Sequence, residues 1–338
     1  MILIVGAGAV GTILATHLAA AGRDVRLYAR ARDVARFDAI AQVRTDFPDA
    51  RPSLTAARPA SVTTLDLRDV QALVIGVKFP DLAALVDQLP DPIPSTCTLV
   101  STLNGYAPLR LLRERRPGAR VVPMSVMMNG QLLGPLHARL TTRAEIVLGD
   151  ADAALLAAFG GTGMIVKAAP GDAAVWGKLL INLANAICAL TRTTFKDLFL
   201  DPDLRRVYVA VLDEATGALD ASHLPWKLPL VLPYGAYRWA LLHGGPLPWW
   251  FAKYRNGVRE GAYPSMVSDV EAGKATEVEQ LNGEVVRLGR DSGFATPVNA
   301  KLVEMIGASR TPAHITPAEL RAAVSQTVAR TKSGGVDL

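Results

Sequence analysis

The sequence predicts an α/β protein in two parts, a doubly wound parallel sheet followed by an all-helical domain. Three observations lead to this prediction. Up to about residue 170, apolar runs of strand length alternate with helical patterns. A glycine-rich loop directly follows the first apolar run. Beyond residue 171, the strand patterns cease and apolar residues recur at helical spacing.

The first strand, loop and helix are written without a gap. Met1–Val5 is apolar, Gly6-Ala7-Gly8-Ala9-Val10-Gly11 follows it, and a helical stretch runs from Thr12 to Gly22. A lone G-x-G-x-x-G is weak evidence, but this context is the one that a Rossmann-type dinucleotide fold requires. Gly6 permits the tight turn, Gly8 lets the backbone approach a pyrophosphate, and Gly11 lets the helix pack close to the strand. Residues 6–11 are therefore predicted to bind a dinucleotide; the alternative is a glycine turn in an unrelated α/β protein.

The second predicted strand, Asp24–Arg30, indicates which dinucleotide would bind. A binder of NAD usually ends this strand with Asp or Glu, about 20 residues past the loop, to hold the ribose 2′-hydroxyl. Here the strand ends in Ala29-Arg30, followed by Ala31-Arg32, and the first carboxylate is Asp33, expected inside the next helix. The planar guanidinium of Arg30 suits a 2′-phosphate. The sequence favours NADP(H) over NAD(H); the alternative is that both arginines cover a solvated helix start.

After an irregular stretch, the rest of the first domain reads as strands with connecting helices. The predicted strands are Ser61–Leu65, Ala72–Lys78, Thr98–Leu103 and Arg120–Val126, with a helix at Pro80–Leu89 and a hairpin within Gln131–Gly149. The sheet is expected to end near Ala169-Pro170-Gly171. The domain boundaries are therefore placed at 1–170, 171–312 and 313–338, the last being a C-terminal helix and a flexible tail.

The second domain is predicted to be helical throughout. Its helices are Ala173–Leu190, Pro202–Ala221, Ser265–Gly273, Thr276–Arg290 and Asn299–Ser309. Thr276 with Glu279, and Thr316 with Glu319, have the spacing of a capping box. The flexible tail is expected to include Lys332-Ser333-Gly334-Gly335.

Composition limits the class of protein. Of 338 residues, 50% are hydrophobic and 20% are charged, which predicts a sizeable core. The only cysteines, Cys97 and Cys188, lie far apart in apolar contexts, so neither disulfides nor a metal site is expected, and a cytoplasmic location fits. The net charge of +5 suits an anionic cofactor and substrate. Because the basic stretch Arg110–Arg120 lacks aromatic residues for base stacking, no nucleic-acid partner is expected, and no membrane partner either.

Two polar features follow predicted strands. Lys78 comes after the apolar run that ends at Val77, and Asn104-Gly105 follows Leu103. Ligands of open α/β sheets bind outside the carboxyl ends of the strands, so both side chains should border the cofactor. The alternatives are an exposed lysine at a strand end and a simple turn.

Two further polar features lie in the helical domain. Lys178, Asn182 and Asn185 fall on one narrow helical face whose neighbours are Leu, Ile and Ala. Such groups are costly on an apolar helix unless they line a wet cavity. Ser265 and Glu277 stand at the starts of two predicted helices; taken singly, each also fits a capping or helix-dipole role.

Together these features resemble the ketopantoate reductase (2-dehydropantoate 2-reductase) family. The resemblance covers about residues 1–310 and runs from the glycine loop through Lys78, Asn104-Gly105 and Lys178-x-x-x-Asn182 to Ser265-Met266-x-x-Asp269, Thr276–Gly283 and Gly293–Asn299. It implies a helical domain of the 6-phosphogluconate dehydrogenase-like type. It also implies NADPH-dependent reduction of a small 2-keto acid, ketopantoate to (R)-pantoate in the pantothenate pathway.

The resemblance also implies roles for the residues. Lys178 would donate a proton to the ketone oxygen, which suits a lysine whose pKa is lowered by partial burial. Glu277 would hold a substrate hydroxyl or Lys178 itself, and Lys78 would lie near the nicotinamide. The predicted substrate-binding residues are Asn104, which also borders the cofactor, Asn182, Asn185 and Ser265. The site would form in the cleft between the domains, so closure is expected to accompany binding.

Two departures from the family pattern bear on the substrate. The family's second helix amide more often falls eight residues after the lysine, where this chain has Ala186, and the nearest amide is Asn185. The stretch His223–Tyr263, rich in Pro, Trp and Tyr, does not align with the family. It could pack in the core or cleft, form a subunit contact in a homodimer, or meet a membrane surface.

Other functions stay open on the sequence alone. One is a dehydrogenase of the same superfamily that acts on a different hydroxy or keto acid. Another is a non-catalytic NADP-binding sensor, against which the joint presence of Lys178, Asn182, Ser265 and Glu277 argues, because a sensor needs only the nucleotide half.

Overall fold

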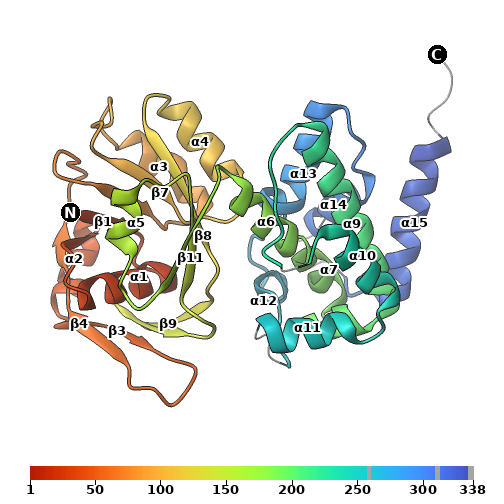
Figure 1. The fold of residues 1–338 in the computed structure, drawn as a ribbon, viewed down its shortest axis with the longest axis horizontal. Helices are drawn as coiled ribbons and strands as arrows, with labels where there is room; N and C mark the ends of the chain where they lie inside the picture. The colour runs from red at the N-terminus through yellow and green to blue at the C-terminus, as the bar shows by residue number, and fades with distance from the viewer. Residues whose placement is uncertain (231, 257–259, 309–312, 334–338) are drawn as a thin grey trace. The chain divides into compact units, whose positions relative to one another are not determined.

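The computed structural model describes residues 1–230, 232–256, 260–308 and 313–333. Two compact units divide the chain, Met1–Val175 and Trp176–Leu338, and each is described by itself. The first is mixed α/β and the second is helical, as the sequence predicts (Figure 1).

The first unit is built on an eight-stranded sheet. All neighbouring strands are parallel except β11, which pairs antiparallel with β8. The strands in spatial order are β12 (Ile165–Ala169), β11 (Glu145–Gly149), β8 (Arg120–Val126), β7 (Thr98–Ser101), β6 (Ala72–Ile75), β1 (Ile2–Val5), β2 (Val25–Tyr28) and β5 (Ala60–Val62).

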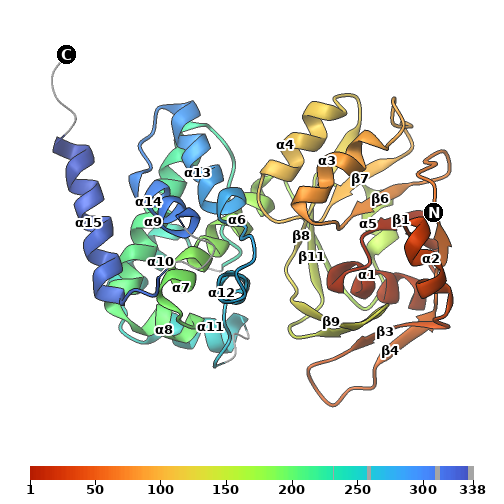
Figure 2. The ribbon, with the colours of Figure 1, turned by 180° about the vertical axis from the view of Figure 1, so that it is seen from behind.

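Alternate residues of the same strands supply two separate cores, one on each face of this sheet. On β1, Ile2 and Ile4 join the first core, which includes α1 (Ala9–Ala20) and α5 (Ala153–Phe159). Leu3 and Val5 join the second, which includes α3 (Phe79–Asp87) and α4 (Ala107–Arg115). Strands buried on both faces read as continuous apolar runs, which is why the sequence identifies them. Figure 2 shows α3 and α4 together over the sheet. The predicted doubly wound sheet is confirmed.

The helix expected around Asp33 is confirmed as α2 (Ala31–Asp38). The prediction of an irregular stretch before β5 is wrong, because that stretch holds β3 (Gln42–Asp46) and β4 (Leu54–Ala57). With β10 (His137–Leu140) and β9 (Gly130–Gly134), β3 and β4 form a second, four-stranded sheet. The hairpin predicted around Gly134 is confirmed as the antiparallel pair β9–β10. The pairing of β3 with β10 joins segments about ninety residues apart, so no local pattern announces it.

The second unit packs its helices around α7 and α9. All eight residues of α7 are buried, and α9 buries one apolar face along its length. The helices are α6 (Ala173–Asn182), which begins at the end of the first unit, α7 (Ala184–Thr191), α8 (Phe195–Leu200), α9 (Pro202–Ala221), α10 (Tyr234–His243), α11 (Leu247–Asn256), α12 (Ser265–Glu271), α13 (Val278–Ser292), α14 (Pro297–Gly307) and α15 (Pro317–Ser333).

Several helix ends differ from the predictions. The predicted helix Ala173–Leu190 is divided into α6 and α7 at Leu183. Thr316 and Glu319 form the predicted capping box, but Thr276 and Glu279 do not, because α13 begins later, with Glu277 as its N-cap residue. Ser309 lies outside the described residues, as do Gly334 and Gly335 of the expected tail, whereas Lys332 and Ser333 end α15.

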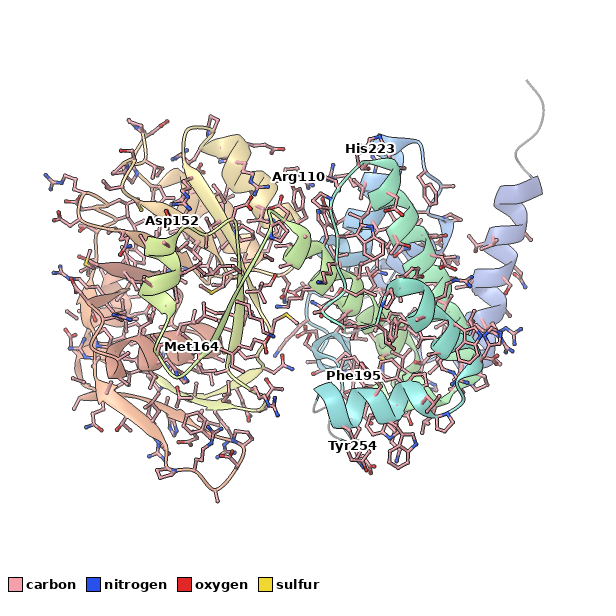
Figure 3. All side chains as sticks on the ribbon, viewed as in Figure 1. Arg110, Asp152, Met164, Phe195, His223 and Tyr254 are labelled. Carbon is pink, nitrogen blue, oxygen red and sulfur yellow. The ribbon has the colours of Figure 1, made fainter. Side chains whose placement is uncertain are left out.

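The stretch that departs from the family pattern forms α10 and α11. Its inner side packs on α9: the Tyr234 hydroxyl donates to Asp213 (2.6 Å) and the Trp226 indole donates to Asp220 (2.8 Å). Its outer side is aromatic. Trp250 and Tyr254 stack with ring centroids 5.3 Å apart, and Tyr254, 70% exposed, projects from α11 (Figure 3).

One helical stretch among the described residues, Ala173–Thr191, is long and apolar enough to cross a membrane by length and composition. Most of it (78%) is buried inside the protein, as a core helix is, so it is weak evidence for a span. Cys97 and Cys188 are both free and buried.

A half-buried carboxylate on α9 and the Asn299 side chain on α14 link α9, α13 and α14. Glu214 on α9 accepts hydrogen bonds from the backbone N–H groups of Val298 (2.7 Å) and Asn299 (2.9 Å) and from the Asn299 side chain (2.8 Å). The Asn282 amide on α13 donates to Asn299 Oδ1 (3.1 Å). The carboxylate therefore satisfies two of the orphan donors at the start of α14.

Replacing this carboxylate should destabilise the helical unit. We expect Glu214→Ala to lower the free energy of unfolding by about 1–3 kcal/mol, because buried N–H donors lose their acceptor. Urea unfolding followed by circular dichroism measures it. Glu304→Ala is the control, since that exposed side chain on α14 pairs with Lys301, another α14 residue. Equal stability of the two variants would contradict the assignment.

Candidate active site

The loops that would hold a dinucleotide lie at one edge of the large sheet. The parallel strands β7, β6, β1 and β2 are consecutive neighbours, so their carboxyl ends share that edge. Along it stand Asn104 after β7, Lys78 after β6, the glycine loop after β1 and Arg30 after β2. The chain leaves β1 toward β2 and returns to β6 on its other side. This reversal is where open α/β sheets bind ligands.

The glycine loop is shaped by close backbone approaches. Gly6 has φ +105°, and a Cβ there would lie 2.5 Å from the carbonyl of Gly76 at the end of β6. A Cβ on Gly11 would overlap the carbonyl oxygen of Gly6. Gly8, the N-cap residue of α1, has nothing within 4 Å of its Cβ position. The protein thus leaves open space beside Gly8 while it closes tightly around Gly6 and Gly11.

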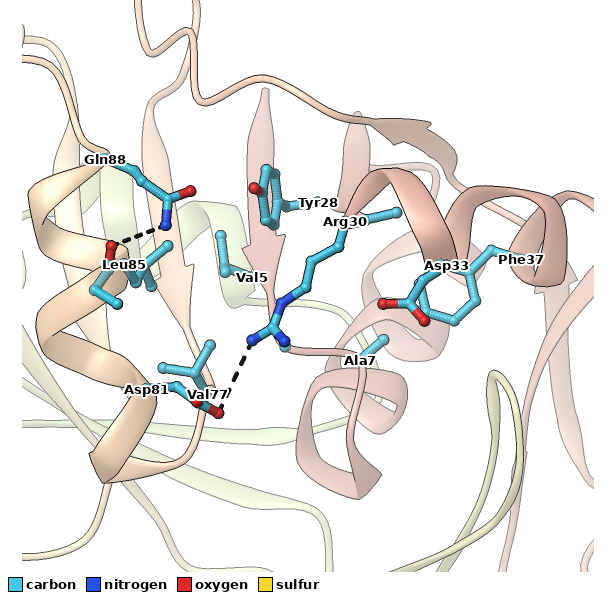
Figure 4. A pocket seen from close by; sticks show the side chains of 13 residues that line it. Val5, Ala7, Tyr28, Arg30, Asp33, Phe37, Val77, Asp81, Leu85 and Gln88 are labelled. Carbon is cyan, nitrogen blue, oxygen red and sulfur yellow. Dashed lines mark hydrogen bonds and ion pairs between the residues drawn. The ribbon is translucent and has the colours of Figure 1, made fainter.

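A pocket of about 550 Å³ opens beside the loop (Figure 4). It is lined by the end of β1 and the loop (Val5, Gly6, Ala7), by the end of β2 (Tyr28, Ala29, Arg30), by α2 (Asp33, Phe37) and by β6 and α3 (Val77, Asp81, Ala84, Leu85, Gln88). Arg30 is the N-cap residue of α2, and its Nη2 lies 4.0 Å from Asp81 Oδ2. A pocket with a guanidinium next to a glycine loop fits the phosphate end of a dinucleotide.

Asp33 has no binding role among the residues predicted from the sequence. It is inside α2, as predicted, yet it lines the same pocket as Arg30 because it stands in the first helical turn. Arg32, by contrast, is not among the lining residues; it is exposed, 3.9 Å from Asp33. The sequence did carry a signal for this position: Asp33 follows Arg30 by three residues, so one helical turn brings it to the same side of the chain.

Lys78 and Asn104 occupy the positions expected at this edge. Lys78 is the exposed N-cap residue of α3, and Asn104 is half-buried. The turn after Asn104 is anchored by Gly105, whose φ is +79°, and by Tyr106, whose hydroxyl accepts a hydrogen bond from Arg113 (3.1 Å). Arg113 also donates two hydrogen bonds to Asp172 (2.7 and 2.8 Å).

The second unit carries the other candidate residues. Lys178 lies on α6, and burial lowers the pKa of its amine to about 8, while the nearby carboxylate of Glu277 opposes that decrease. Glu277 is the N-cap residue of α13, so α6 and α13 bring these two groups into electrostatic contact. A lysine with such a pKa can hold and release a proton near neutral pH.

Close packing fixes the backbone beside Lys178. A Cβ on the preceding residue, Gly177, would overlap the carbonyl oxygen of Lys227. The chain after α9 therefore lies directly against α6 at this point.

The remaining predicted residues occupy three different elements. Asn182 ends α6 and is half-buried, and Asn185 lies on α7 and is 7% exposed. Ser265 is exposed and is the first residue of α12, while Pro264 takes the N-cap position. An N-cap role for Ser265 is thus wrong. For Glu277, the cap position is observed without a side-chain capping bond.

These features define a class: a dinucleotide-binding α/β unit joined to a helical unit that carries a half-buried lysine with a lowered pKa. Comparison with known proteins gives the family. The family model described as "Ketopantoate reductase PanE/ApbA" matches residues 2–153, and the one described as "Ketopantoate reductase PanE/ApbA C terminal" matches residues 172–310. The chain belongs to the ketopantoate reductase family, whose members are oxidoreductases acting on CH–OH groups.

Individual relatives agree with this assignment. The chain is 25% identical over 322 residues to the 2-dehydropantoate 2-reductase of Aquifex aeolicus, covering 90% of this chain and 96% of that protein. The PanE/ApbA family ketopantoate reductase of Ralstonia eutropha has a similar fold, with a TM-score of 0.71, 23% identity, and coverage of 97% of this chain and 100% of that one. D-mandelate dehydrogenase, in its complex with NADH and anilino(oxo)acetate, also has a similar fold. Its TM-score is 0.70, with 17% identity and coverage of 97% of this chain and 100% of that one.

The loop geometry predicts different effects for two glycine substitutions. Gly8→Ala should leave stability unchanged but weaken NADPH binding at least tenfold, because its methyl group would enter the space beside the loop. Gly11→Ala should destabilise the protein by about 1–3 kcal/mol through overpacking. Urea unfolding and NADPH fluorescence titration measure the two effects. Tight NADPH binding by Gly8→Ala would contradict this assignment of the open space.

Proposed function

We propose that this protein reduces a 2-keto acid to a 2-hydroxy acid with NADPH, and that its substrate is ketopantoate, giving (R)-pantoate. The observation that carries the proposal is the lowered pKa of the half-buried Lys178 near Glu277, in a chain that also has a pocket beside the glycine loop. Reduction of a ketone needs a hydride for the carbon and a proton for the oxygen. When bound, NADPH supplies the hydride.

Lys178 supplies the proton in this proposal. As the keto carbon gains the hydride, the C=O π electrons move to oxygen and take a proton from the ammonium, which becomes a neutral amine. Solvent then restores that proton. A pKa of about 8 suits this task, because the amine is still mostly protonated at neutral pH yet releases its proton more readily than an ordinary lysine.

The other residues would bind and orient the reactants. Asn104 and Ser265 would hold the substrate, Asn182 and Asn185 its polar groups, and Glu277 a substrate hydroxyl or the Lys178 ammonium. The glycine loop residues 6–11, Arg30 and Lys78 would bind the cofactor, with Arg30 on the 2′-phosphate. Asn104, next along the sheet edge from Lys78, would border both reactants.

The oligomeric state and the cellular location of the protein are part of the same proposal. We propose that the chain acts in the cytoplasm, as two free, buried cysteines suit, and that it forms a homodimer. Sedimentation velocity tests the homodimer.

The direct test is oxidation of NADPH with ketopantoate against a panel of 2-keto acids. The panel should include an aromatic member, phenylglyoxylate, because the fold is shared with D-mandelate dehydrogenase and α10 and α11 present aromatic side chains. Preference for ketopantoate supports the proposal. Preference for another keto acid would contradict the substrate, and NADPH binding without any turnover would contradict catalysis.

Removing the proton donor should separate catalysis from binding. We expect Lys178→Ala to lower kcat about 10²–10⁴-fold, the usual contribution of a positioned general acid, while the Kd for NADPH stays within twofold. Lys301→Ala is the control, since this lysine on α14 pairs with Glu304. A Lys178→Ala variant that keeps wild-type kcat would exclude this lysine as the donor.

The pH profile should report the pair of Lys178 and Glu277. Because the donor must be protonated, kcat should be level below about pH 8 and fall tenfold per unit above it. Glu277→Gln removes the charge that raises the pKa of Lys178, so the falling limb should move to lower pH. Profiles of both proteins over pH 6–10 measure the change. An unmoved limb would show that Glu277 does not act on the donor.

A further inference from the structure

We propose that two carboxylates, Asp33 and Asp81, set how far the Arg30 pocket distinguishes a 2′-phosphate from a 2′-hydroxyl on the adenosine ribose. The inference rests on the proposed function, since it takes the pocket to be the dinucleotide site. It goes beyond that function because it assigns cofactor discrimination to two acids that the sequence left without a role.

Arg30 does not stand alone in the pocket. Figure 4 shows its side chain extending between Ala7 and Val77 toward Asp81, in the first turn of α3. The separation of 4.0 Å is too long for a hydrogen bond, and the two side chains are 52% and 56% exposed. This attraction is therefore weak, and the guanidinium can exchange Asp81 for a phosphate. Asp81 nevertheless remains as a negative charge near any phosphate that Arg30 binds.

Asp33 occupies the opposite side of Arg30. It projects from the first turn of α2, its side chain is 35% exposed, and it lines the same pocket. A carboxylate about 20 residues past the glycine loop can accept a hydrogen bond from a ribose 2′-hydroxyl. The same carboxylate opposes a 2′-phosphate through like-charge repulsion.

In this proposal the pocket holds one side chain that favours NADP(H) and another that favours NAD(H). Arg30 favours the 2′-phosphate, Asp33 favours the 2′-hydroxyl, and Asp81 competes for Arg30. Because each of these contacts is partly exposed, each should change affinity by about three- to tenfold. The wild-type protein is accordingly expected to bind both NADPH and NADH, with a preference for NADPH of no more than about tenfold.

The experiment measures binding alone, with no keto acid present. Isothermal titration of the full chain with 2′,5′-ADP and with 5′-AMP compares two ligands that differ only in the 2′-phosphate. Asp33→Asn should bind 2′,5′-ADP more tightly and 5′-AMP more weakly, so the ratio of the two dissociation constants moves about tenfold or more toward the phosphate. Asp81→Asn should tighten 2′,5′-ADP about three- to tenfold and leave 5′-AMP unchanged.

Asp38→Asn is the matched control. Asp38 ends the same helix, is 51% exposed, pairs with Arg58 at 3.0 Å and is not among the residues that line the pocket. It should leave both dissociation constants unchanged. Thermal unfolding of all three variants verifies that each is folded, which is expected because every substitution replaces a partly exposed carboxylate with its amide.

The outcomes separate the inference from the function beneath it. A ratio in Asp33→Asn and Asp81→Asn equal to that in Asp38→Asn, with both ligands bound, overturns the inference and leaves the nucleotide site intact. Failure of the wild-type chain to bind 2′,5′-ADP, 5′-AMP and NADPH overturns the proposed function and the inference with it. A shifted ratio in Asp33→Asn together with tighter 2′,5′-ADP in Asp81→Asn supports the inference.

Discussion

The proposed chemistry of this protein depends on one constraint, the desolvation of a half-buried lysine on an apolar helix. Lys178 lies on α6, a helix that is otherwise largely apolar, and desolvation by burial lowers the pKa of its amine to about 8. Glu277 limits that decrease, so the amine stays largely charged at neutral pH instead of becoming a permanently neutral base. The Gly177 contact with Lys227 fixes the backbone next to the lysine, and the Glu214 cluster fixes the helix that carries Glu277.

The first unit is suited to a phosphate-rich ligand mainly through the geometry of its backbone, because few charged side chains line its pocket. Gly6 and Gly11 let β1, β6 and α1 approach more closely than any side chain would allow, and Gly8 keeps open the space in front of the helix. The charged side chains that line the pocket beside it, Arg30 with Asp33 and Asp81, are the ones that we propose adjust which nucleotide is preferred. The close packing of the loop thus depends on the glycines, and in this proposal selectivity depends on the three charged side chains.

Much of this was predictable from the sequence because its strongest signals are local. Strands buried on both faces, such as Ala72–Ile75, are continuous apolar runs, and α9 begins and ends where its proline and its apolar period predict. Non-local pairing was not predictable: β3 and β4 become strands only by pairing with each other and with β10. The Thr276–Glu279 box failed because α13 starts at Val278, and Asp33 was overlooked because a helical turn, rather than the strand end, directs it into the pocket. The roles of Asn182, Asn185 and Ser265 came from family resemblance and stay predictions.

Titration of Lys178 itself shows whether this lysine is able to deliver a proton near neutral pH. Lysine labelled with ¹³C at the ε position gives one NMR signal per side chain, and the signal that disappears in Lys178→Arg identifies this residue. We expect a titration midpoint near pH 8, well below the ordinary value for lysine. A midpoint at the ordinary value for lysine, about 10.4, would contradict it, because the amine would then be solvated and not suited to deliver a proton.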